Sequence, residues 1–148
     1  IHTHSRAGSA VSAMKDGLLP ISQTALRFYG RVGYHDFEGP VLHNDERERL
    51  VASLGNKDAL ILRNHGLLVV GRSIPEAFHS MQRLESACQI QVDALASGVE
   101  LTYPSTKVCE ATVEVLAGRN GEKLPASGRL EWAALLRDLQ RTDPDYID

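Results

Sequence analysis

Two histidines near the start of the chain are spaced so that both can bind one metal ion. His2 and His4 are two residues apart in a segment that we interpret as the end of a strand. Side chains alternate between the two faces of a strand, so both imidazoles lie on one face, with Cα atoms about 6–7 Å apart. Two imidazoles in this arrangement can converge on a single ion.

A metal site needs a third ligand, and His65 is the best candidate for it. His65 stands in a predicted turn between two strands, next to Gly66, which allows the backbone to approach closely. Three histidine ligands that leave a position open are typical of catalytic rather than structural zinc. The spacing also fits histidines that are only solvated or hydrogen-bonded, because six histidines in 148 residues will often produce such a pair by chance.

The other histidines carry weaker signals. His35 lies in Tyr34-His35-Asp36, where it could act as a general base oriented by a carboxylate. The alternative is a histidine that only stabilises a loop through hydrogen bonds. We interpret His43 and His79 as surface or structural residues.

The elements that must position these residues can be read from periodicity and turn signals. Ser73-Ile74-Pro75-Glu76 matches a capping box with proline in the first turn, and predicts a helix that ends before Gly98. We expect strands over 1–4, 59–62 and 67–70, the last two joined by a hairpin turn. Helices are expected over 5–16, 23–29, 105–117 and 128–141, with a polar stretch between the last two, and a short helix is expected between a cap at Asp45 and Gly55. Residues 30–39 are expected to form a turn segment. This alternation of strands and helices predicts an α/β layer architecture.

The composition fits one domain or a large part of one, with 43% hydrophobic and 24% charged residues. The net charge of −3 argues against nucleic-acid binding, which requires a basic face. Apolar runs such as 67–70 are too short to cross a membrane.

Two cysteines, Cys88 and Cys109, fit a reducing cytoplasm, and Cys88 stands in an apolar helical stripe where we expect it to pack in the core. The chain begins with Ile1 and has no leader-like segment, so we expect that further sequence precedes it.

Several stretches, in this order, resemble the class II aldolase/adducin family, and the likeness is greatest to its adducin-like bacterial branch. The resemblance covers residues 1 to about 97, and a weaker likeness extends to Glu131–Leu136. The stretches are His2-Thr3-His4-Ser5, Ala10-Val11-Ser12-Ala13-Met14-Lys15, Gly17-Leu18-Leu19-Pro20, Tyr34-His35-Asp36-Phe37-Glu38-Gly39, Leu62-Arg63-Asn64-His65-Gly66-Leu67 and Cys88-Gln89-Ile90-Gln91-Val92.

This resemblance implies a three-layer α/β/α domain around a central, mostly antiparallel sheet, assembled into a tetramer or ring. It implies that residues 1–148 are the C-terminal portion of a single domain, with a helical tail from about residue 105. In family enzymes the histidine pair and the later histidine bind zinc, which corresponds here to His2, His4 and His65. Another divalent transition metal is the alternative.

The resemblance also shows which catalytic parts are not in this chain. The catalytic glutamate of family aldolases lies upstream of the histidine pair. Sugar-phosphate aldolases carry a tyrosine soon after the proline that follows the first helix, whereas here no tyrosine follows Pro20 until Tyr29. Tyr29, His35 and Asp36 remain weak candidates for the acid or base, with Glu38 as a further substitute.

Three functions are therefore compatible with the sequence. The first is a metal-dependent carbon–carbon lyase that stabilises an enediolate during aldol cleavage or decarboxylation of a small oxygenated carbonyl compound. The second is a non-catalytic, adducin-like domain for assembly and partner binding. The third is an epimerase or isomerase that uses the same metal site. Retention of all three histidines favours an enzyme.

Overall fold

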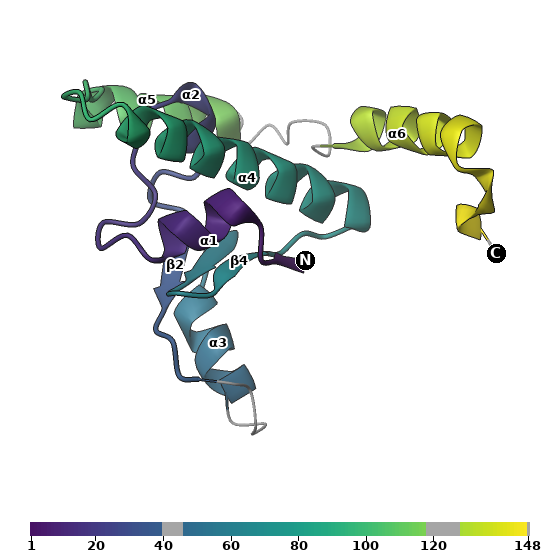
Figure 1. The fold of residues 1–148 in the computed structure, drawn as a ribbon, viewed down its shortest axis with the longest axis horizontal. Coiled ribbons are helices and arrows are strands. Elements are labelled where there is room, and N and C mark those ends of the chain that lie inside the picture. The colour runs from purple at the N-terminus through teal and green to yellow at the C-terminus, as the bar shows by residue number, and fades with distance from the viewer. Residues whose placement is uncertain (40–45, 118–127, 148) are drawn as a thin grey trace.

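The computed structural model describes residues 1–39, 46–117 and 128–147, and its core is a four-stranded sheet with helices on both faces. The strands are β1 (His2–Thr3), β2 (Val32–His35), β3 (Ala59–Leu62) and β4 (Gly66–Val69), in the spatial order β1-β4-β3-β2. Helices α1 (Arg6–Ser12) and α4 (Ile74–Ala96) cover one face, and α3 (Glu46–Leu54) lies on the other (Figure 1). The predicted α/β/α layering is confirmed.

The sheet is mixed, which corrects the expectation of a mostly antiparallel one. β4 pairs antiparallel with both β1 and β3, but β2 runs parallel to β3, with His35 opposite Leu62. The prediction of a turn segment over 30–39 is wrong, because residues in its middle form β2. A parallel neighbour needs a crossover connection, and α3 supplies it between β2 and β3.

The central strand β3 is buried on both faces, since each of its four residues is at most 7% exposed. Its first and third side chains join a core with α1 and α4, while the other two point towards α3. This explains the uninterrupted apolar sequence of β3. The core cluster consists of Ala7, Val11, Phe28, Ala59, Ile61, Leu67, Val69, Ala77, Met81, Leu84 and Cys88.

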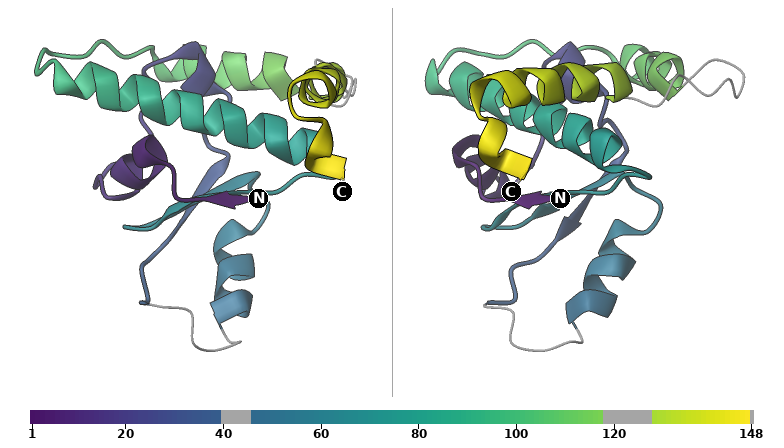
Figure 2. Two further views of the ribbon diagram at one scale, coloured as in Figure 1. Left: turned by 45° about the vertical axis from the view of Figure 1, so that its right-hand side comes forward. Right: turned by 90° about the vertical axis from the view of Figure 1, so that its right-hand side faces the viewer.

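Helix α4 is the longest element and begins and ends as its sequence predicts. The Ser73 hydroxyl accepts a hydrogen bond from the backbone N–H of Glu76, and Glu76 in turn accepts one from the N–H of Arg72. Helix α2 (Gln23–Leu26) and helix α5 (Thr106–Ala117) lie on the side of α4 away from the sheet (Figure 2).

The carboxyl-terminal helix α6 (Arg129–Thr142) and the short helix η2 (Pro144–Ile147) lie beyond the amino-terminal end of α4 (Figure 1). Their main contact with α4 includes the rings of Phe78 and Trp132, whose centroids are 5.3 Å apart. The expected cap at Asp45, the polar stretch before α6 and His43 lie outside the described residues. Within the described part of the chain, no helix is both long and apolar enough to span a membrane.

Gln91, on α4, fixes the turn that follows α1 and is the basis of a stability prediction. Its side chain is fully buried, donates to the carbonyl of Gly17 at 2.8 Å and accepts from the N–H of Leu19 at 2.7 Å. A Gln91→Met variant leaves both backbone groups without these partners. We expect the free energy of unfolding to fall by about 2–4 kcal/mol, measured by urea titration.

Gln89→Met is the matched control, because Gln89 is exposed on the same helix and bonds only to Glu85 there. Its effect should stay below about 0.5 kcal/mol. Equal stability of the two variants would contradict the role of Gln91.

Candidate metal site

The three histidines singled out by the sequence lie together at one edge of the sheet. His2 is in β1, His4 follows that strand, and His65 stands in the turn between β3 and β4. Their ring centroids are 4.6 to 4.8 Å apart in every pairing. Each offers one ring nitrogen such that the three nitrogens lie within 4.8 Å of one another.

The pairing of β1 with β4 and a glycine in the turn create this convergence, although His4 and His65 are 61 positions apart in the sequence. β1 pairs with β4 so that His2 is opposite Leu68, which brings the histidine pair beside the strand that follows His65. Gly66 permits the close approach, because a Cβ atom there would lie 2.3 Å from the carbonyl oxygen of Thr3. A side chain at this position would push β1 away from the turn.

The orientation of His2 is set by a hydrogen bond to the backbone. Its Nδ1 donates to the carbonyl of Leu67 at 2.8 Å, so the neutral ring carries its lone pair on Nε2. That Nε2 lies 2.7 Å from Nε2 of His4. A histidine whose second nitrogen donates to a carbonyl is the usual arrangement of a metal ligand.

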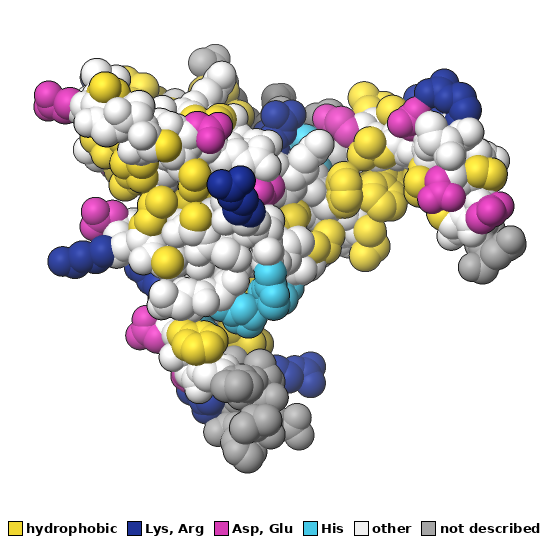
Figure 3. Space-filling model, viewed as in Figure 1, with side chains coloured by type: hydrophobic (Ala, Val, Ile, Leu, Met, Phe, Trp, Pro, Cys, Tyr) yellow, Lys and Arg dark blue, Asp and Glu magenta, His cyan; other side chains and the backbone are white. Residues whose placement is uncertain are grey.

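The donor set therefore fits a divalent transition metal. Three imidazole nitrogens suit zinc, and they leave coordination positions for substrate oxygens. His2 and His4 are exposed and His65 is half-buried, so small molecules have access to the cluster. Figure 3 shows histidine side chains gathered in a patch on this face of the molecule.

A surface depression of about 530 Å³ lies next to His65 and could admit part of a substrate. Its lining includes Asp36, Phe37, Asn64 and the stretch Ser12–Lys15, which covers the last residue of α1 and the three that follow it. The Phe37 ring is 6.3 Å from that of His65. Arg63 lines it as well, and Arg63 also donates to the carbonyl of Met14 at 2.6 Å and stacks over Tyr34.

The weak candidates for an acid or base lie in different places. Asp36 is exposed and lines this depression. His35, the last residue of β2, is buried against α3. Its Nδ1 is 2.9 Å from the hydroxyl of Ser53, and its Nε2 is 4.0 Å from a carboxylate oxygen of Glu38. Their catalytic roles stay predictions.

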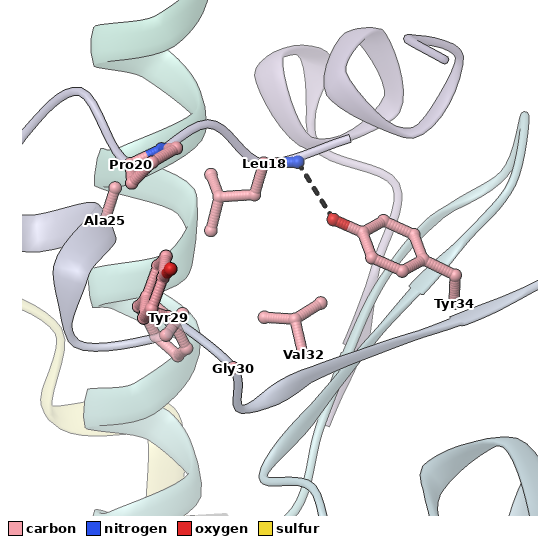
Figure 4. A pocket seen from close by; sticks show the side chains of 8 residues that line it. Leu18, Pro20, Ala25, Tyr29, Gly30, Val32 and Tyr34 are labelled. Carbon is pink, nitrogen blue, oxygen red and sulfur yellow. Dashed lines mark hydrogen bonds between the residues drawn. The ribbon is translucent and has the colours of Figure 1, made fainter. Parts of the chain in front are cut away.

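Tyr29 lines a separate cavity of about 280 Å³ between α2 and β2, together with Leu18, Pro20 and Tyr34 (Figure 4). None of the three clustered histidines belongs to the lining of that cavity. The Tyr34 hydroxyl accepts from the N–H of Leu18, so this tyrosine is engaged in holding the loop after α1.

Cys88 packs in the core, as its position in the sequence predicts. It is fully buried, and burial together with the charge of Glu85 raises the pKa of its thiol to about 12. Such a thiol stays protonated at neutral pH and is a poor nucleophile.

His79 is a structural residue on α4 and makes folding sensitive to pH. It is 4% exposed, and burial, reinforced by the charges of Arg83 and Arg27 and opposed by Glu131 on α6, lowers its pKa. The folded protein therefore binds a proton less readily than the unfolded chain. The resulting stability is present above the ordinary pKa of about 6.5 and is lost as the pH falls below it.

We expect that the free energy of unfolding of the natural protein decreases more steeply between pH 7 and pH 5 than that of a His79→Gln variant. Urea titrations at a series of pH values measure both curves. Parallel curves for the two proteins would show that His79 does not contribute to the acid sensitivity.

The chain is similar to known proteins in both sequence and fold. The model of the "Class II Aldolase and Adducin N-terminal domain" matches residues 1–92. The chain is 42% identical over 146 residues to a protein of Pseudomonas aeruginosa named "Putative aldolase class 2 protein", covering 99% of this chain and 56% of that protein. The chain thus spans about half the length of the curated relatives it matches.

Two solved structures show the same fold. An aldolase II superfamily protein from Pseudomonas syringae is 48% identical with a TM-score of 0.89, covering 100% of this chain and 58% of that one. The L-fuculose 1-phosphate aldolase from Glaciozyma antarctica is 26% identical with a TM-score of 0.75, covering 97% and 52%.

Proposed function

The chain belongs to the class II aldolase and adducin family, and from this premise we propose that it carries the metal-binding part of a carbon–carbon lyase. The observation that carries the proposal is the convergence of His2, His4 and His65, whose ligand nitrogens lie within 4.8 Å of one another. These side chains would hold zinc or another divalent transition metal. The substrate would be a small oxygenated carbonyl compound.

The chemistry of such a centre follows from charge. A divalent cation bound there supplies a Lewis acid that offsets the negative charge developing on substrate oxygens when a neighbouring carbon–carbon bond breaks. His2 keeps its Nε2 lone pair available because its Nδ1–H bonds to the carbonyl of Leu67. The backbone of the His65 turn fixes the third ring, and the depression beside Phe37 and Asp36 would receive the remainder of the substrate.

The family likeness supports this class of reaction at a coarse level. The fuculose-phosphate aldolase among the similar structures cleaves a carbon–carbon bond by its name, and it shares the fold over nearly the whole chain. We further propose that residues 1–148 form the C-terminal portion of a longer domain, which acts as a homo-oligomer. The relatives' greater length supports the first of these points.

A second candidate function is a non-catalytic, adducin-like domain for assembly, because the family model covers adducins as well as aldolases. An epimerase that uses the same metal site is a third, and substrate trials with the full-length protein would separate it from the lyase. Metal binding would distinguish the first two candidates, since an assembly domain has no physical need for three imidazoles that converge on an ion.

The first test is metal content, measured by plasma mass spectrometry on full-length protein purified without a nickel column. We expect about one zinc per chain, and His65→Ala should lose it, with a decrease in affinity of more than about 100-fold, since even residues outside the ligand set can change affinity 10–100-fold. His35→Gln is the matched control, because His35 bonds to Ser53 outside the cluster and should retain zinc.

Activity is then screened with small aldols and hydroxy-carboxylates. A chelator should abolish cleavage and added zinc should restore it. Full lyase activity in metal-free protein would refute the proposed mechanism. Protein that takes up no zinc even when it is supplied would favour the adducin-like assembly domain.

A further inference from the structure

The turn that carries His65 is held against α1 by one buried serine. We propose that Ser12 is a positioning residue, which fixes the His65 imidazole for metal binding and is not itself a metal ligand. The inference rests on the proposed role of His65 as a ligand, and it adds to that role a residue outside the ligand set. Ser12 is the last residue of α1 and is fully buried.

The hydroxyl of Ser12 has two partners, and both are backbone groups. It accepts a hydrogen bond from the N–H of His65 at 3.1 Å and donates one to the carbonyl of Ser9 at 2.7 Å. The same N–H of His65 also donates to the carbonyl of Leu62 at 3.1 Å, within the turn. The bond to the Ser9 carbonyl lies within α1 and orients the Ser12 hydroxyl so that a lone pair of its oxygen faces the turn. The backbone carbonyl of Ser12 accepts from the N–H of Asn64 at 3.2 Å, so one residue binds two consecutive amides of the turn.

A second serine bonds the other side of the same residue. The hydroxyl of Ser9 donates to the carbonyl of His65 at 3.2 Å. The N–H and the carbonyl of His65 are therefore both attached to α1. Its Cα–Cβ bond, and with it the imidazole, is fixed relative to that helix.

The backbone of the turn requires such support. Asn64 has a φ of 55°, in the left-handed region that side chains other than glycine seldom adopt. Asparagine adopts this conformation more readily than other residues with a side chain, and the surrounding contacts determine where it persists. The bonds from Asn64 and His65 to Ser12 are those contacts.

The same helix also connects to the other two ligands. α1 begins at Arg6, two residues after His4, so a short stretch of chain joins the helix to the histidine pair that β1 pairs against β4. At its other end Ser12 holds His65. Metal ligands need to be placed within about 0.5 Å, and α1 is the common reference for all three.

The test compares Ser12→Ala with Ser86→Ala in the full-length protein. Ser86 makes the same kind of bond, donating to the carbonyl of Gln82 within α4 at 2.9 Å, but it contacts no residue of the turn. We expect Ser12→Ala to weaken zinc affinity about 10- to 100-fold, measured by competition with a chromophoric chelator. Ser86→Ala should retain the affinity of the natural protein.

Two further measurements separate positioning from general destabilisation. The visible spectrum of the cobalt-substituted protein reports ligand geometry, and it should change in Ser12→Ala only. Amide hydrogen exchange in metal-free protein should become several-fold faster at His65 in Ser12→Ala, because this amide loses one of its acceptors. Asn64 keeps its bond to the backbone carbonyl of residue 12 and serves as an internal reference. Should Ser12→Ala fail to fold, Ser9→Ala takes its place, because it removes the bond to the His65 carbonyl and leaves the buried Ser12 intact.

The outcomes distinguish this inference from the proposed function. Zinc affinity and cobalt spectrum unchanged in a folded Ser12→Ala variant would overturn the positioning role while leaving the metal site standing. If the natural protein binds no zinc, the proposed function fails. Hydrogen exchange in the metal-free natural protein and in metal-free Ser12→Ala then tests whether Ser12 positions His65. Equal exchange at His65 in the natural protein and in Ser12→Ala would then overturn the inference as well.

Discussion

The docking of the 63–66 turn onto α1 is the constraint on which the histidine cluster depends. Hydrogen bonds from Asn64 and His65 to Ser12 attach the turn to the helix, and Arg63 adds a bond to the carbonyl of Met14. Pairing of β1 with β4 closes the arrangement from the other side. Since the two segments are about 60 residues apart, only tertiary structure can bring their imidazoles together.

Helix α1 can serve as a reference because the core holds it. With 7 residues it is too short to be stable alone in water. Val11 packs fully buried in the cluster with Leu84 and Cys88 of α4. Gly8 brings the helix down onto Leu67 of the sheet, since a Cβ atom there would lie 2.6 Å from that side chain. Apolar burial thus determines ligand geometry through one short helix.

The sequence predicts local features well and long-range pairing poorly. The capping box, the hairpin around His65 and the shared face of His2 and His4 depend on nearby residues, and each element lies where expected. β2 was missed because Val32-Gly33-Tyr34-His35 contains a glycine and no clear alternation, and its partner is more than twenty residues away. The role of Ser12 has no local signal either, since a serine at the end of a helix has many ordinary uses.

The short contact between His2 and His4 shows what a cation changes at this site. The bond from Nδ1–H of His2 to Leu67 makes its Nε2 an acceptor, so the 2.7 Å contact requires Nε2 of His4 to donate. A shared cation instead requires a lone pair on both atoms. The proton of His4 must then sit on Nδ1. The hydrogen bond and metal coordination are alternative uses of the same two nitrogens. The tautomer of His4 decides between them, because the bond to Leu67 already fixes the tautomer of His2.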